Sequence, residues 1–327
     1  MRKRRFLGLV VAAAAAPLVA RSQSVARLGI LVPQAESDTE AQRELEVLRA
    51  ELRKLGWPEG GRLRIEQRWA AGDFSQLRRL AGELVALKPN VIVCRSTPPT
   101  RAVLEATRSI PVVFLVVSDP VGDGIVASLA RPGGNATGFT NVEDSLGGKW
   151  LELLKELSPR MERVGALYNP KTSPGGGAYY LRLVSDAAVA LGLQLRPLIV
   201  HDAREIEGLI DALAAQPRAG LLVMPDTTNI THRTPILAAA ARHRLPAIYT
   251  IPTFALDGGL VSYGVDIADI YRRGAGYVDQ ILKGAKPGEL PVQAPTKFEL
   301  TINAKTAKAL DIAVPRSLLL RADRVIE

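Results

Sequence analysis

The chain has 327 residues, which exceeds the length that one hydrophobic core usually serves, so one large or two medium domains are expected. The apolar content of 47% and the charged content of 23% are ordinary for a globular protein. The formal net charge of +9 is misleading, because residues 1–22 hold five of the 42 Lys and Arg and no acid. The rest has 37 basic against 33 acidic residues, too mild a surplus to indicate a nucleic-acid-binding surface.

Residues 1–22 have the three parts of a secretory signal peptide. A basic segment, residues 2–5, precedes an apolar run of 14 residues, and Ala20-Arg21-Ser22 is a small-x-small cleavage site. The run is shorter than the roughly 20 residues that span a bilayer, which favours cleavage over an anchor. Residues 3–7 resemble a twin-arginine signal with Lys in the first basic position, and general secretion stays an equal alternative. We therefore expect a periplasmic protein.

The first half of the chain alternates apolar strands with amphipathic helices. Strands are predicted at 26–32, 63–69, 90–94 and 111–117, and helices at 39–55, at 73–87 and in a segment that ends near 108. Cys94, the only cysteine, ends an apolar strand and is expected to be a buried, inert thiol. Residues 137–141 are short and poorly helical, and we expect the chain to pass there from one domain to the next. Strands that alternate with helices indicate βαβ units and a parallel sheet.

The second half repeats this alternation. Helices are predicted at 145–157, 179–191, 205–215, 235–244 and 266–282, strands at 163–168, 193–200, 219–224, 246–249, 260–263 and 297–302, and a short helix at 303–310. The similar order of Pro, apolar strand and polar loop in the two halves indicates two similar lobes. We expect an N-terminal lobe of 23–141 plus about 264–290, a C-terminal lobe of 142–263, and a tail, 291–327, that crosses the hinge.

The sequence contains none of three common catalytic motifs. It has no G-x-x-x-x-G-K-[ST], no G-x-G-x-x-G after the first strand and no G-x-S-x-G. The three histidines are His201, His232 and His243, and none has a second His or Cys at zinc-ligand spacing. His232 and His243 are expected on the solvated surface. No catalytic residue, metal or cofactor is predicted.

Polar residues stand at the ends of the predicted parallel strands. In open α/β sheets, ligands bind outside the carboxyl ends of the strands, and free N–H groups of the following helices bind carboxylates. An acid such as Asp226 could pair with the ammonium group of a ligand. Each residue could instead act only as a helix cap or turn former. The predicted ligand-binding residues are Gln34, Ser96, Thr97, Ser118, Asp119, Thr140, Asn141, Asn169, Asp226, Tyr249 and Tyr263.

The sequence resembles the ABC-transporter substrate-binding family typified by exported tryptophan- and tyrosine-binding proteins. The resemblance covers nearly all of the chain after residue 22, and the residues that carry it are 119–122 (DPVG), 128–138 (SLARPGGNATG), 151–155 (LELLK), 244–249 (RLPAIY), 258–264 (GGLVSYG) and 295–300 (PTKFEL). It implies the type I periplasmic binding protein fold, an α/β fold of two Rossmann-like lobes with parallel sheets joined by hinge strands.

The resemblance also places the binding residues. It implies that Ser96 and Thr97 match the family's Ser/Thr position after the third strand, and that Ser118 and Asp119 match the end of the fourth. Asn169 and Asp226 match strand ends of the second lobe. Residues 95–99 (RSTPP) are a departure, because many members have small residues around the Thr; Arg95 could reach an acidic ligand or face solvent.

The predicted function is that of a solute-binding component of an ABC importer, without catalysis. The ligand is a small polar molecule such as an amino acid, and the partner is a permease in the inner membrane; we expect a monomer that binds no nucleic acid. Two alternatives stay open at this point: a periplasmic sensor that signals to a membrane receptor, and an enzyme of unrecognised class. A neighbouring permease gene would distinguish transport from sensing, and turnover of a bound ligand would indicate an enzyme.

Overall fold

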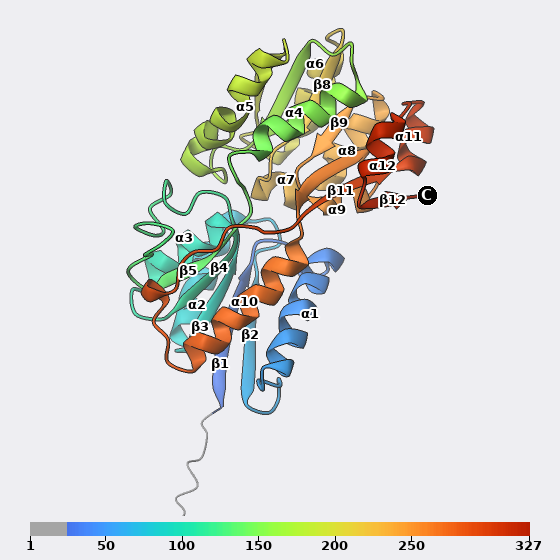
Figure 1. Ribbon diagram of the computed structural model, residues 1–327. Coiled ribbons are helices and arrows are strands. Elements are labelled where there is room, and N and C mark those ends of the chain that lie inside the picture. The colour runs from blue at the N-terminus through green and yellow to red at the C-terminus, as the bar shows by residue number, and fades with distance from the viewer. Residues whose placement is uncertain (1–24) are drawn as a thin grey trace, which may run out of the picture.

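The computed structural model describes residues 25–327, and the predicted signal peptide lies outside them. The chain forms two α/β bodies, one above the other, joined by crossing segments (Figure 1). We call the body built on the first sheet the N-lobe and the body built on the second sheet the C-lobe. The predicted fold class is confirmed.

The N-lobe is a five-stranded parallel sheet covered on both faces. Its strand order is β2-β1-β3-β4-β5. The strands are β1 (Ala26–Val32), β2 (Leu63–Trp69), β3 (Val91–Arg95), β4 (Val112–Val117) and β5 (Ala136–Thr140). One face packs against α1 (Thr39–Lys54) and α10 (Ile267–Leu282), and the other against α2 (Leu77–Ala86) and α3 (Thr97–Ala106). β3 and β4 are buried at every position, as apolar runs with helices on both sides must be.

The C-lobe is a seven-stranded sheet in the order β12-β11-β10-β9-β8-β6-β7. Its strands are β6 (Arg163–Tyr168), β7 (Gln194–Ile199), β8 (Ala219–Val223), β9 (Ala247–Tyr249), β10 (Val261–Val265), β11 (Phe298–Asn303) and β12 (Arg324–Ile326). Its helices are α4 (Leu146–Leu157), α5 (Ala178–Ala190), α6 (Ile206–Ala214), α7 (Thr227–Thr231), α8 (Arg233–Arg242), α9 (Pro252–Leu256), α11 (Ala304–Leu310) and α12 (Arg316–Arg321). α4 packs beside α5 and α6 beside α8, over two separate core clusters.

Three features differ from the sequence predictions. Residues 136–140 are strand β5, paired with β4, and the passage to the C-lobe follows them. The short helices α7, α9 and α12 and the strand β12 were not predicted, because segments of three to six residues are too short to show a period. The second sheet is not wholly parallel, because β11 pairs antiparallel to β10; β11 and β12 extend the C-lobe sheet.

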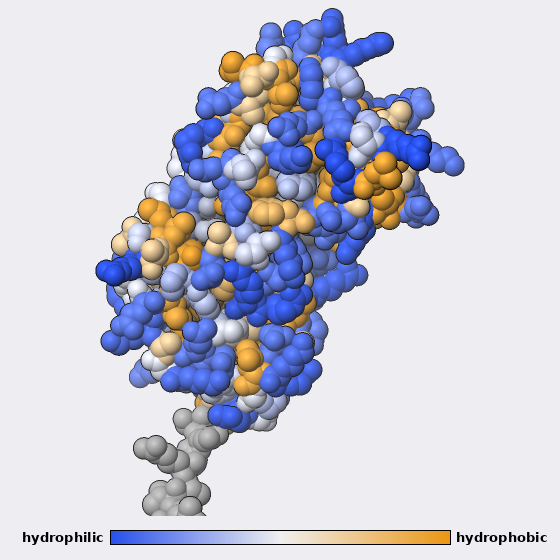
Figure 2. Space-filling model, viewed as in Figure 1, coloured by the Kyte–Doolittle hydropathy of each residue, from blue (hydrophilic) through white to orange (hydrophobic). Residues whose placement is uncertain are grey.

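The face of the molecule in view is mostly hydrophilic (Figure 2). An apolar group lies over the C-terminal elements, where Leu320 is 76% exposed. Within residues 25–327, no helix combines the length and the apolar character needed to cross a bilayer.

Candidate functional site

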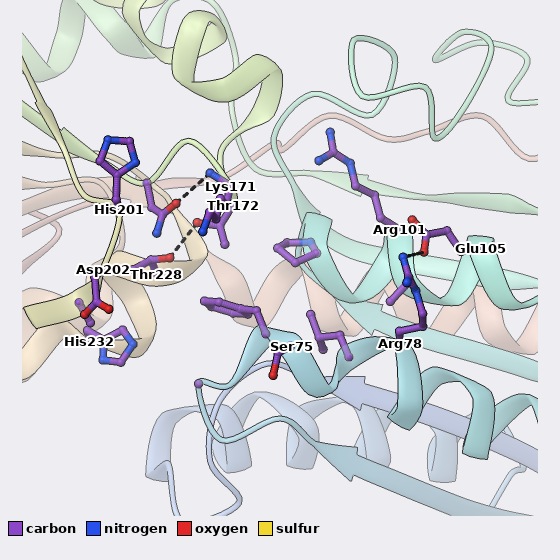
Figure 3. A pocket seen from close by; sticks show the side chains of 17 residues that line it. Ser75, Arg78, Arg101, Glu105, Lys171, Thr172, His201, Asp202, Thr228 and His232 are labelled. Atoms are coloured by element: carbon purple, nitrogen blue, oxygen red, sulfur yellow. Dashed lines mark hydrogen bonds and ion pairs between the residues drawn. The ribbon is translucent and has the colours of Figure 1, made fainter.

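A cleft of about 750 Å³ lies between the two lobes and is lined by residues of both (Figure 3). The N-lobe wall is partly apolar and includes Phe74, Leu77, Pro98 and Ala102, with charged side chains at its edge. The C-lobe wall is polar and includes Asn169, Lys171, Thr172, His201, Asp202, Thr228 and His232. The cleft therefore offers an apolar surface on one side and hydrogen-bonding groups on the other.

The N-lobe strand ends carry strained backbone. Ser96, which follows β3, has a φ of 70° and Val116, in β4, has a φ of 61°. A positive φ is unusual for any residue with a side chain, and for a β-branched residue such as Val it is an outlier. The pairing of β4 with β5 changes register beside Val116, and a side chain at Gly138 would collide with the Phe114 carbonyl. Strain of this kind is concentrated at functional sites.

Three predicted residues of the N-lobe keep buried polar atoms without a partner. These atoms are the Gln34 Oε1 after β1, the Ser96 Oγ after β3 and the Asn141 Nδ2 after β5. The three residues are at most 4% exposed. Buried polar groups are almost always hydrogen-bonded, so this group at three strand ends of one sheet needs an explanation.

Ser118, after β4, takes part in a contact between the lobes. Its Oγ lies 3.0 Å from the Asn141 Oδ1 and 3.0 Å from the hydroxyl of Tyr180 in α5. The Tyr180 hydroxyl in turn lies 2.9 Å from the Pro225 carbonyl of the C-lobe. Tyr180 is 1% exposed, and burial raises the pKa of its phenol well above the ordinary value. The Ser118 side chain therefore has two partners within the chain, and Tyr180 is not among the residues predicted from the sequence.

The other predicted N-lobe residues lie nearby with different contacts. The Asp119 carboxylate accepts from the Gly122 N–H at 2.8 Å, as a turn former does. The Thr140 N–H donates to the Gln293 carbonyl at 2.9 Å, which ties β5 to a crossing segment. Thr97 is the first residue of α3 and is 5% exposed.

Asp226 is wholly buried and is hydrogen-bonded to residues of the C-lobe wall of the cleft. Its Oδ1 accepts from the Thr228 and Asn229 N–H groups at 2.7 and 3.2 Å, which caps α7. Its Oδ2 accepts from the Asn169 N–H at 3.2 Å and from the Ser173 hydroxyl, and the Thr172 hydroxyl reaches both oxygens. Burial raises the pKa of Asp226, although these donors oppose the shift. With five donors around it, the carboxylate organises this loop, and this geometry favours a positioning role over ligand contact.

Asn169 lines the cleft, and its own side chain is partly engaged. Its Oδ1 accepts from the Lys171 N–H at 2.8 Å. Lys171 is exposed at the cleft edge, and the Thr172 and Thr228 hydroxyls lie 2.9 Å apart beside it (Figure 3).

Of the predicted residues, Asn169 alone is among the described residues that line this cleft, and the predicted N-lobe residues, apart from half-buried Asp119, lie buried at the strand ends. The two predicted tyrosines do not line it either. Tyr249 is 2% exposed and stacks on Phe254 at a ring distance of 4.9 Å, within a hydrophobic core. Tyr263 stacks on Phe298 at 6.2 Å, on the strand pair β10 and β11. Phe74 is the aromatic residue that lines the cleft, whereas Tyr180 is buried and contacts Ser118 between the lobes.

Two expectations for charged residues are corrected. Arg95 neither faces solvent nor reaches the cleft, because its Nε and Nη2 pair with the Glu44 carboxylate of α1 at 2.6 and 2.9 Å, with both side chains 3% exposed. Because of its position in β3, the Arg95 side chain lies on the face of the sheet that α1 and α10 cover. His232 is half-buried at the cleft instead of solvated, and burial lowers the pKa of its imidazole.

Cys94 is buried as expected, and burial raises the pKa of its thiol. Within the described part of the chain, no group of three or more His, Cys, Asp or Glu is placed to hold a metal ion.

Residues 38–326 match the family described as ABC transporter substrate binding protein. The chain belongs to this family. It is 28% identical over 262 residues to a tyrosine-binding protein of Clostridioides difficile, covering 80% of this chain and 74% of that protein.

Two solved structures show the same fold at similar identity. One is a conserved domain protein from Vibrio cholerae, with a TM-score of 0.86, 27% identity, and coverage of 92% of this chain and 100% of the other. The second is an ABC domain in complex with L-Trp from Streptococcus pneumonia, with a TM-score of 0.85, 26% identity, and coverage of 93% and 100%. The chain is thus a substrate-binding protein of the type I periplasmic binding fold.

Proposed function

We propose that the protein is the extracytoplasmic solute-binding component of an ABC importer, and that it holds an amino acid between its lobes without catalysis. The observation that carries this proposal is the group of unpartnered buried atoms of Gln34, Ser96 and Asn141. A buried polar group left without a partner costs about 1–3 kcal/mol, and a polar ligand would remove that cost.

The chemistry of these atoms suits a zwitterion. The Asn141 amide and the Ser96 hydroxyl can donate to a carboxylate, and the Gln34 carbonyl can accept from an ammonium group. The apolar N-lobe wall around Phe74 and Leu77 can cover an apolar side chain. The tyrosine-binding relative and the L-Trp complex support this ligand class.

We also propose that the lobes move as the sequence predicts. The N-lobe would comprise 23–141 with about 264–290, and the C-lobe 142–263 with most of the tail 291–327. The packing of α10 on α1, and the pairing of β11 with β10, support this division. Closure would bring the N-lobe and C-lobe walls of the cleft together around the ligand, with hinges near Thr140 and Tyr263.

The expected signal peptide would deliver the protein to the periplasm, where an inner-membrane permease would receive the ligand from a monomeric binding protein. A thermal-shift screen tests the binding step. The protein is first unfolded and refolded to remove any co-purified ligand, and then heated with amino acids, purines, nucleosides and small carboxylates. A ligand at 100 times its Kd should stabilise the protein by about 2.7 kcal/mol. If L-tryptophan, L-tyrosine and every other amino acid leave the Tm unchanged, the proposal is wrong.

A further inference from the structure

Arg233, the first residue of α8, forms ion pairs with both lobes. Its Nη1 lies 2.7 Å from the Asp38 Oδ2 of the N-lobe, and its Nε lies 2.5 Å from the Asp257 Oδ2 of the C-lobe. Its Nη1 also donates to the Ile230 carbonyl at 3.1 Å, which fixes the guanidinium to its own lobe. The planar fork of Arg suits this bridge, because it can meet two carboxylates at once.

Asp38 is held ready for this contact by its own lobe. It is the N-cap of α1, and its Oδ1 accepts from the Glu40 and Ala41 N–H groups at 3.1 and 3.0 Å. The other oxygen is left for Arg233. Burial raises the pKa of Asp38, but the Arg233 hydrogen bond and the Ala41 N–H outweigh it and hold the pKa below the ordinary value. The carboxylate is therefore ionised at neutral pH.

The ion pair between Arg233 and Asp38 is mostly shielded from water. The two side chains are 14% and 12% exposed. Elsewhere along the interface, the loop after β2 meets the end of α7, where a Cβ built on Gly72 would lie 3.0 Å from the Thr231 Cγ2. Since one partner is fixed to each lobe, separation of the lobes must break the pair.

We propose that the ion pair between Arg233 and Asp38 is an interlobe contact that stabilises the closed state and so sets how tightly and how long a ligand is held. This proposal rests on the lobe closure of the proposed function. Truncating one partner of a largely desolvated charge pair leaves the other without its interlobe partner, so the effect should exceed that of a surface pair.

The experiment measures the interlobe distance in the ligand-free protein. Spin labels at Arg53→Cys in α1 and Val189→Cys in α5 lie on exposed positions of the two lobes, and buried Cys94 should stay unlabelled. Double electron–electron resonance then gives the ratio of closed to open molecules. Because no ligand is added, the result is separate from whether L-tryptophan or L-tyrosine binds.

Arg233→Gln should lower the closed-to-open ratio about tenfold, a loss of about 1.4 kcal/mol. Arg233→Lys should lose less, because it keeps the charge without the fork. Asp38→Asn keeps the N-cap oxygen and should match Arg233→Gln, and the double variant should lose little more than either one. The control is Arg242→Gln in the same helix, whose ion pairs with Glu207 and Asp211 stay within the C-lobe.

Identical distance distributions for the wild type and Arg233→Gln overturn the proposal. So does a full additional loss when Asp38→Asn is combined with Arg233→Gln, because two partners of one ion pair cannot act independently. Failure of every amino acid to bind, with the distance changes as expected, would overturn the proposed function and leave the ion pair's role standing.

Discussion

Asp226→Asn tests whether the buried carboxylate stabilises the C-lobe wall of the cleft through its hydrogen bonds. The substitution keeps the side-chain shape but replaces one oxygen with an NH₂ group. If that group takes the place of Oδ2, it faces the Asn169 N–H and the Ser173 hydroxyl, which both donate to the wild-type oxygen. A hydrogen bond to a charged acceptor is worth about 1.5–3 kcal/mol, and a buried donor left unsatisfied costs about 1–3 kcal/mol.

Relief of the buried charge offsets part of this loss, so we expect Asp226→Asn to destabilise the protein by about 2–3 kcal/mol. With an unfolding entropy of about 2.1 cal/mol/K per residue, a chain of roughly 300 residues loses about 1.5 °C of Tm per kcal/mol, so the Tm should fall by roughly 3–5 °C. Differential scanning calorimetry of refolded, ligand-free protein measures this directly. Asp202→Asn is the control, because its carboxylate is a surface cap that pairs with exposed Arg204.

The pH dependence has a defined sign. Burial raises the pKa of Asp226 above its value in the unfolded chain, so ionisation costs more in the folded state. The stabilising contribution of its protonated form is fully present below the unfolded pKa and is lost as the pH rises through the folded pKa. The Tm advantage of the wild type over Asp226→Asn should therefore grow as the pH falls from 7 towards 4. An unchanged Tm in the variant, or an advantage that shrinks on acidification, would show that the Asp226 carboxylate does not stabilise the C-lobe wall of the cleft.

Three further predictions concern other buried groups. Tyr180→Phe removes the hydroxyl that bridges the lobes and should weaken binding of L-tryptophan about fivefold, by about 1 kcal/mol, in calorimetric titration; unchanged affinity, or an equal loss in the neighbouring Tyr179→Phe, contradicts it. Glu44→Gln leaves the Arg95 guanidinium buried without its carboxylate and should cost about 3–5 kcal/mol in urea denaturation, and a cost below about 1 kcal/mol would show that the pair is not buried in solution. Cys94 should react with a thiol reagent only when the protein unfolds, because it is buried and its thiol pKa is raised; fast reaction of the native protein argues against this packing.

The alternation of strands and helices was predictable because each element carries a local signal. A run such as Val112–Val117 is apolar on both faces only when helices cover the sheet on both sides. The positions of Ser96 and Asn141 followed from the same signal, since the carboxyl ends of parallel strands meet at one edge.

The partners of the site residues were not predictable in this way. Ser118 meets Tyr180 from 62 positions away and from the other lobe. Arg95 pairs with Glu44, 51 positions earlier, and this long-range contact decides that it turns away from the cleft. Tyr249 ends β9 and Tyr263 lies in the middle of β10, and their rings stack on Phe254 and Phe298 instead of lining the cleft. Local sequence places a residue at a strand end, whereas tertiary packing decides which way its side chain turns.

Isothermal titration of refolded wild type and of Asn141→Ala with L-tryptophan and L-tyrosine tests whether the N-lobe strand ends bind an amino acid. We expect that at least one of the two amino acids binds with 1:1 stoichiometry and a negative heat-capacity change, and that Asn141→Ala weakens this binding about tenfold or more, because the variant removes the unpartnered Nδ2. Absence of binding heat at several temperatures for both amino acids, or equal affinities of the two proteins, would contradict this expectation.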